Sequence, residues 1–268
     1  MKNHLKRMAK KVVYKNQLHL FWSKSSVGNW GDDLNPILCE LISGKKCRYA
    51  SGEQSNKFMA IGSILSHADN RTEVWGSGFI SSCAKYISRP QKVHAVRGPL
   101  TRKRLIELGY SDVPEIYGDP ALLLAKFAPD PPKKKYKLGI IPHYADKRHP
   151  LIEKYKGDSA CKVIDVSLPI WDFLSTLREC DSIISSSLHG LICADTFKIP
   201  NAWVEFSNKV TGNGFKFSDY FLSTSRPVVK PINLVDNYVA YYPQDSELNY
   251  KINIDLKRLI QSCPFAKS

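Results

Sequence analysis

Along most of the chain, short apolar runs alternate with longer stretches in which apolar residues recur at helical spacing. This alternation is typical of βαβ units, in which helices join parallel strands. In the first half the apolar runs predict strands over Gln17–Trp22, Lys57–Ile61, Glu73–Trp75 and Lys92–Val96. The remaining periodic stretches predict helices over Asp33–Ile42 and Pro99–Leu108, the second with Gly109 as its left-handed cap.

The pattern breaks at residues 127–136, where Pro129, Pro131 and Pro132 forbid a helix and lysines keep the segment in solvent. We interpret this segment as a linker. Beyond it the alternation predicts strands over Leu138–Pro142, Lys162–Ile164, Ser182–Ser185 and Ala202–Val204, and helices over Trp171–Cys180 and His189–Phe197. A last amphipathic helix is predicted near Asp255–Ile260.

These elements predict an α/β protein made of two doubly wound halves. We expect an N-terminal domain over 1–126, the linker over 127–136 and a C-terminal domain over 137–230. Residues 231–268 are expected to pack back across both domains. With 268 residues and 43% hydrophobic positions, the chain is long enough to bury a substantial core.

The net charge of +14 would attract nucleic acid, an anionic membrane or a small anionic substrate. The basic residues are scattered and lack an interleaved aromatic platform, so we expect no nucleic-acid partner. The N-terminal cluster instead predicts peripheral attraction to an anionic membrane, through Lys2, Lys6, Arg7, Lys10 and Lys11.

Seven widely spaced cysteines suggest neither a disulfide framework nor a paired-cysteine metal site, and we interpret them as reduced core thiols. No signal-peptide core and no run of about 18 apolar residues is present, so we expect a cytoplasmic protein. No HExxH motif or tight carboxylate cluster occurs, which predicts that no metal is bound. The GxSxG elbow of serine esterases is also missing.

The most informative segment runs from Ser185 to Gly190, where a predicted strand meets a serine triplet, a histidine and a helix. Ligands of open α/β sheets bind at such strand ends, because helix N-termini converge there and favour anions. His189, with Ser186, Ser187 and Gly190 beside it, is therefore a candidate site. The competing interpretation is a buried histidine that hydrogen-bonds to the backbone.

Other strand ends and loops supply further candidates. Asn29 and Asp32 lie in a loop with two glycines, which fits either a substrate loop or a turn with a helix cap. Arg97 follows a strand and can fork onto a phosphate or carboxylate. The remaining candidates are His143 and Arg148 after a later strand, and Lys209 and Lys216 around a glycine pair, although exposed lysine is also the default surface residue.

Several segments together resemble the polysaccharide pyruvyltransferase family. NWGDDL, VRGPLTRKRL, YGDPALLL, PHYAD and SSSLHGLICADTFKIPNAW occur in the family's order and at about its spacing, over roughly residues 20 to 222. GFKFSDYF resembles the succinoglycan-type branch. The resemblance implies two Rossmann-like domains that face a cleft, like glycosyltransferases of the GT-B type, with the acceptor on the N-terminal side and the donor on the C-terminal side.

The resemblance also implies an activity: transfer of a pyruvyl group from phosphoenolpyruvate to a saccharide, often lipid-linked, as a ketal, with no further cofactor. His189 would be the catalytic acid or base and Arg97 an anchor for the donor. Many members have Arg-Leu-His-Gly where this chain has Ser187-Leu188-His189-Gly190, so another cation would have to replace the missing arginine. A GT-B glycosyltransferase that uses a nucleotide sugar is the alternative.

Overall fold

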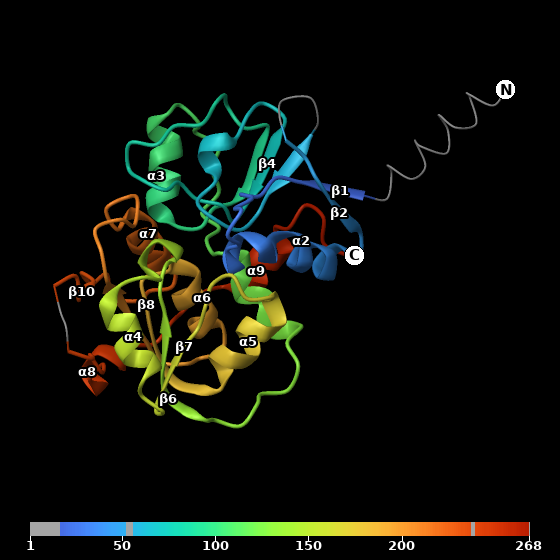
Figure 1. Ribbon diagram of the computed structural model, residues 1–268. Coiled ribbons are helices and arrows are strands. Elements are labelled where there is room, and N and C mark those ends of the chain that lie inside the picture. The colour runs from blue at the N-terminus through green and yellow to red at the C-terminus, as the bar shows by residue number, and fades with distance from the viewer. Residues whose placement is uncertain (1–16, 52–55, 237–238, 268) are drawn as a thin grey trace.

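The computed structural model describes residues 17–51, 56–236 and 239–267. Figure 1 shows two lobes, each built on one sheet, with α2 and α9 lying between them. The basic N-terminal cluster that predicted membrane attraction lies outside the described residues.

The first lobe holds a five-stranded sheet in the order β2-β1-β3-β4-β5, in which every pairing is parallel. Its strands are β1 (Gln17–Leu20), β2 (Lys46–Tyr49), β3 (Lys57–Met59), β4 (Thr72–Trp75) and β5 (Lys92–Ala95). The helical elements are α2 (Trp30–Ser43), η1 (Leu65–His67) and α3 (Pro99–Glu107). Parallel strands need such crossovers because a tight hairpin cannot join them.

The second lobe repeats this plan with the order β10-β9-β8-β6-β7, again with parallel pairings. Its strands are β6 (Tyr136–Ile141), β7 (Cys161–Val163), β8 (Cys180–Ser185), β9 (Asn201–Glu205) and β10 (Ile232–Asn233). The helical elements after residue 119 are η2 (Pro120–Lys126), η3 (Tyr144–Asp146), α4 (Pro150–Lys156), α5 (Ile170–Arg178), α6 (Leu188–Thr196), α7 (Phe215–Ser223), α8 (Asp245–Leu248) and α9 (Leu256–Gln261).

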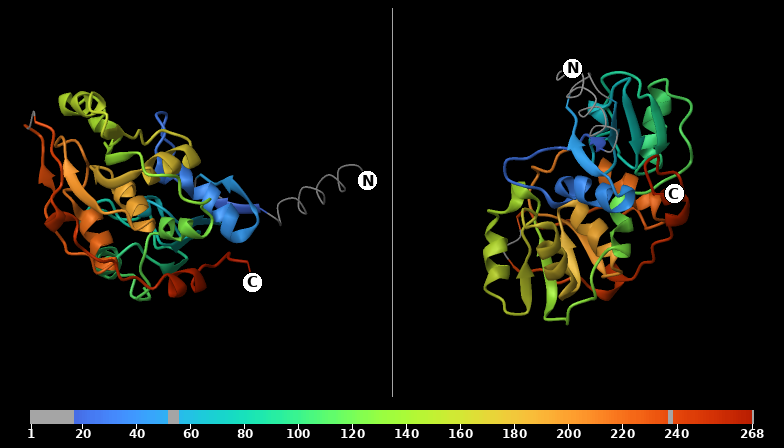
Figure 2. Two further views of the ribbon diagram at one scale, coloured as in Figure 1. Left: turned by 90° about the horizontal axis from the view of Figure 1, so that it is seen from below. Right: turned by 90° about the vertical axis from the view of Figure 1, so that its right-hand side faces the viewer.

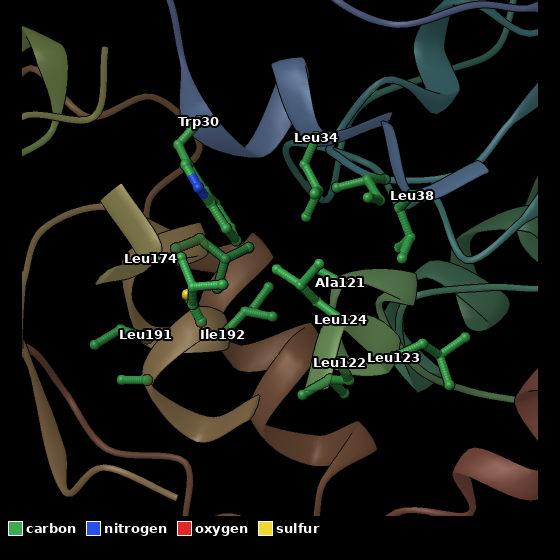
Figure 3. Packing of buried hydrophobic residues seen from close by; sticks show 14 of the residues in the cluster. Trp30, Leu34, Leu38, Ala121, Leu122, Leu123, Leu124, Leu174, Leu191 and Ile192 are labelled. Atoms are coloured by element: carbon green, nitrogen blue, oxygen red, sulfur yellow. The ribbon is translucent and has the colours of Figure 1, made fainter. Parts of the chain in front are cut away.

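One apolar core joins the two lobes. Figure 3 shows Trp30 and Leu34 of α2 facing Leu124 of η2, with Leu191 and Ile192 of α6 close by. All five side chains are buried. Each such side chain contributes about 1.5–3 kcal/mol on burial, so this core fixes the relative position of the helices that border both sheets.

The C-terminal segment runs along one side of the molecule toward the first lobe (Figure 2). The indole of Trp75 donates a hydrogen bond to the carbonyl of Leu259 at 3.0 Å. Gly118, at φ 138°, leaves room for Leu259 and Ile254, either of which a Cβ there would approach to 2.9 Å. Helix α9 thus packs on both the first sheet and η2. The division of the chain into domains stays a prediction.

The α/β class and the parallel sheets predicted from the sequence are confirmed, whereas the likeness to GT-B enzymes stays a prediction. Several predicted boundaries were wrong; β1, for example, ends at Leu20 and β3 at Met59, each two residues before the predicted end. Helix α2 begins at Trp30 rather than Asp33, because the carboxylate of Asp33 accepts a hydrogen bond from the backbone N–H of Asn29 and stabilises an earlier first turn. Cys180 begins β8 instead of ending α5.

The structure also contains elements that the sequence pattern did not predict, among them β2, α4 and α7. All seven cysteines are free; Cys83 is exposed and Cys47 half-buried, so the expectation of core thiols was wrong at these two positions. Within the described ranges, no helix has the length and apolar character needed to cross a bilayer.

Candidate active site

A pocket of about 200 Å³ lies between the lobes. The first lobe supplies one part of its wall, including Asn29, Asp32 and Ser63. The other part comes from segments after residue 140, including His143, Tyr144, Ser187, His189 and Lys216. Six residues predicted from the sequence as site candidates therefore share one pocket: Asn29, Asp32, His143, Ser187, His189 and Lys216.

The first turns of three helices meet at this pocket. Asn29 is the N-cap of α2, Ser187 is the N-cap of α6, and Lys216 is the second residue of α7. The amides of a first turn have no partner within their helix, and a helix N-terminus carries about half a positive charge. Ser187 caps α6 without a side-chain hydrogen bond to that helix, and it lines the pocket. The N-termini of α6 and α7 favour a small anion, whereas α2 carries Asp32 and Asp33 in its first turn.

His189 is the second residue of α6, and its imidazole packs against α2 from the other lobe. A Cβ added at Gly31 would come within 1.9 Å of Nδ1. The imidazole side chain is 12% exposed. Its Nε2 is buried without a hydrogen-bond partner among the described residues and lies 3.7 Å from Oδ2 of Asp119.

An aspartate before a proline is typical of a helix cap, and Asp119 is one: its Oδ1 accepts a hydrogen bond from the N–H of Ala121 at 3.0 Å. The structure adds a second contact, because Oδ2 faces His189. Sequence reasoning missed this contact, since an Asp-Pro pair before a helix is fully explained by capping. The signal that could have revealed it was its place in the YGDPALLL segment.

The charged groups of the pocket influence one another. Burial raises the pKa of Asp32, while the charge of His189 and the hydrogen bond from Asn29 oppose this. Burial lowers the pKa of Lys216 to about 8; Arg97 adds to this effect and Asp32 opposes it. Burial, assisted by Lys216, lowers the pKa of His143 to about 4, so its imidazole is neutral at pH 7.

Arg97 lies behind the pocket and does not line it. Its side chain is fully buried and pairs at 3.0 Å with Asp219, which is also fully buried. The guanidinium donates to the hydroxyl of Ser63 and to the carbonyl of Phe79, each at 2.6 Å. Arg97 is therefore not placed to contact a ligand of the pocket directly. Instead, Arg97 supports the pocket wall through its hydrogen bond to Ser63.

Four further candidates also lie away from the pocket. The hydroxyl of Ser186 donates to Asp146 at 2.6 Å and accepts from the backbone N–H of His143. Gly190 lets α6 approach β8, because a Cβ there would come within 2.4 Å of the hydroxyl of Ser185. Arg148 and Lys209 are exposed and do not line the pocket. Among the residues that the structure describes, no group of three or more His, Cys, Asp or Glu side chains could hold a metal ion.

The fold and pocket define an α/β protein in which a polar pocket with a histidine in its wall lies between two parallel sheets. Comparison with known sequences gives the family: polysaccharide pyruvyl transferase matches residues 50–208, more than half of the chain. The chain belongs to the polysaccharide pyruvyl transferase family, which confirms the resemblance seen in the sequence motifs.

Two relatives extend the match. An uncharacterized protein of Acanthamoeba polyphaga mimivirus is 31% identical over 218 residues, covering 78% of this chain and 75% of that protein. Succinoglycan biosynthesis protein ExoV of Rhizobium meliloti (strain 1021) is 28% identical over 227 residues, covering 80% of this chain and 67% of that protein. The family match contains Asp119, His143 and His189, whereas Asp32 and Lys216 lie outside it.

Proposed function

We propose that this chain transfers a pyruvyl group from phosphoenolpyruvate to two hydroxyls of one sugar in a surface polysaccharide or its lipid-linked precursor. Family membership supports pyruvyl transfer to polysaccharide. The observation that carries the choice of donor is the pocket, which Lys216 and the N-termini of α6 and α7 line together with His189. A phosphate and a carboxylate on one small molecule need such fixed positive charge.

The size of the pocket also favours a small donor. Its volume of about 200 Å³ lies below the roughly 300–1,000 Å³ that is usual for drug-sized ligands. A nucleotide sugar would need a larger enclosed site. The anionic three-carbon skeleton of phosphoenolpyruvate suits the smaller one.

In the proposed reaction His189 donates a proton to the methylene carbon of phosphoenolpyruvate, which becomes a methyl group. One sugar hydroxyl adds to C2, and a second hydroxyl of the same sugar displaces the phosphate. Of the two hydroxyl protons, one returns to His189 and the other leaves with the phosphate, so the reaction balances. A positioned acid–base group contributes about 10²- to 10⁴-fold in rate.

The test incubates the purified protein with phosphoenolpyruvate and a panel of pyranosides, and follows phosphate release and the mass of the saccharide. We expect phosphate release that depends on the saccharide, with one pyruvate ketal gained per product. A parallel set uses UDP-sugars as donors. Nucleotide release from a UDP-sugar, with no phosphate released from phosphoenolpyruvate, would contradict the proposal and favour a glycosyltransferase.

A lipid-linked acceptor would be found at an anionic membrane surface. The basic residues of the first eleven positions would help the protein to bind that surface. Each cation near such a surface contributes about 1 kcal/mol, and salt weakens the attraction. We therefore expect the full chain to bind phosphatidylserine vesicles at low salt and a chain without residues 1–11 to bind them less. Equal binding by the two chains would count against this part of the proposal.

A further inference from the structure

Two buried polar atoms face each other behind the pocket, and neither has a hydrogen-bond partner in the described part of the chain: Oδ2 of Asp119 and Nε2 of His189. Their separation of 3.7 Å is an ion-pair distance and is longer than a hydrogen bond. Buried polar atoms in native proteins are nearly always satisfied. Hydrogen bonds between catalytic groups are often long in the ligand-free enzyme and shorten when the substrate binds. The pair therefore points to a contact that closes during the reaction.

The carboxylate of Asp119 is held in place by its surroundings. The side chain is fully buried, and its Oδ1 is used by the backbone N–H of Ala121. The next residue, Pro120, packs on Gly76, where an added Cβ would come within 2.3 Å of the proline ring. Because Oδ1 of Asp119 is fixed as the cap of η2, Oδ2 points toward His189.

The imidazole of His189 is confined on a second side by Gly31, whose backbone approaches Nδ1. Because Nε2 is buried against Asp119, Nδ1 is the nitrogen left to face the pocket. The other charged or titratable groups of the pocket wall are Asp32 from α2, Lys216 from α7, and His143 and Tyr144 at the start of η3.

We propose that Asp119 is a positioning residue that holds a proton on Nε2 of His189, so that Nδ1 is the atom that exchanges a proton with the substrate. An ionised carboxylate only accepts hydrogen bonds, which requires Nε2 to donate. The neutral ring that remains after proton donation then keeps its N–H toward Asp119, and Nδ1 is free to take a proton back from a sugar hydroxyl. The same division of roles operates in Ser-His-Asp hydrolases. This inference rests on the proposed function for its catalytic consequence.

The variant that tests this role is Asp119→Asn. The amide oxygen can keep the hydrogen bond from Ala121, whereas the amide nitrogen would donate to Nε2 and move the ring proton to Nδ1. We expect kcat to fall about a hundredfold or more, with KM for phosphoenolpyruvate changed less than about threefold and the melting temperature nearly kept. Asp255→Asn is the matched control, because Asp255 caps α9 in the same way but is exposed and lies away from the pocket.

A second measurement is independent of the donor. Long-range ¹H–¹⁵N correlation spectra report which ring nitrogen of His189 carries the proton, and a His189→Gln variant assigns the signals. We expect the Nε2–H form in the wild type and the Nδ1–H form in Asp119→Asn. An Nδ1–H form in the wild type overturns the inference, even if the variant does not fold. A wild type that releases no phosphate sinks the proposed function instead, and the spectra still decide the role of Asp119.

Discussion

The imidazole of His189 lies so close to the backbone of Gly31 that a Cβ at position 31 would come within 1.9 Å of Nδ1 and 2.1 Å of Cγ. Gly31 is the second residue of α2, where the helical backbone itself does not need glycine. The space taken by the histidine therefore explains the glycine. A helix of the first lobe thus limits the position of the His189 imidazole, which the second lobe carries.

Replacing Gly31 should lower activity strongly while changing stability little. Alanine is favoured over glycine inside a helix by about 1 kcal/mol, which offsets part of the cost of the closer contact in Gly31→Ala. The imidazole, however, has to move, and a displacement of about 1 Å can cost about a hundredfold in rate. We expect kcat to fall at least about tenfold while the melting temperature changes by only a few degrees.

The control for this variant is Gly109→Ala. Gly109 has φ +86°, and a Cβ added there would meet no described atom within 4 Å, so alanine is strained at this position but is not obstructed. We expect lower stability, by about 1 kcal/mol, and unchanged turnover. If Gly31→Ala also keeps wild-type turnover, the close packing of the two lobes at His189 does not position the ring.

Removing the imidazole tests the acid–base assignment directly. His189→Ala should abolish turnover, because a general acid contributes at least about a hundredfold. The native melting temperature should be nearly kept, since the ring lies at a pocket wall and its Nε2 has no hydrogen bond to lose among the described residues. Phosphate release and thermal unfolding are the two measurements. Activity above about a tenth of the wild-type value would show that another group transfers the proton.

The strand-end argument was sufficient to predict part of the site. Ser187 and His189 follow β8, and His143 follows β6, which pairs with β8 in parallel. The carboxyl ends of parallel strands share one edge of a sheet, so these residues had to lie near one another. Asn29 and Asp32 follow β1 in the other sheet. Whether they lie near His189 depends on how the two lobes pack, and the local sequence pattern does not determine that packing.

The remaining site residues depended on contacts between distant segments. Asp119 makes the capping contact expected of it, yet the direction of its second oxygen follows from packing across the core. Helix α7 was not predicted because its aromatic residues are modest helix formers. It is stabilised by packing instead, with Phe217 stacked on Trp203 at 4.2 Å between ring centroids. That unpredicted helix is what places Lys216 in the pocket.

The buried pair of Arg97 and Asp219 gives a prediction about stability. Removing one partner leaves an uncompensated charge in the interior, which costs about 3–5 kcal/mol. We expect Arg97→Met and Asp219→Leu each to lower the free energy of unfolding by about this amount, and the double variant to recover part of the loss. Denaturant unfolding measures it. A stable Arg97→Met protein with a strongly raised KM for phosphoenolpyruvate would restore Arg97 as a direct anchor.

Lys216 gives a prediction about pH. Its pKa is lowered from 10.5 to about 8, chiefly by burial, so the ammonium is present below pH 8 and is lost as the pH rises through this value. Because a charge-assisted hydrogen bond contributes about 1.5–3 kcal/mol, we expect KM for phosphoenolpyruvate to increase about ten- to a hundredfold above pH 8. Lys216→Met should show the high KM at every pH, without this transition.

The lowered pKa of Lys216 also fixes the direction in which Lys216→Met changes the free energy of unfolding. A lysine whose pKa is lower in the folded than in the unfolded state costs stability when it is charged, and the free energy of unfolding rises between pH 8 and 10.5. At pH 7 Lys216→Met should therefore be at least as stable as the wild type. Lys209→Met is the matched control, since Lys209 is exposed and lies outside the pocket, and its KM should not change. An unchanged KM in Lys216→Met would remove Lys216 from the donor site and leave the helix N-termini as its source of positive charge.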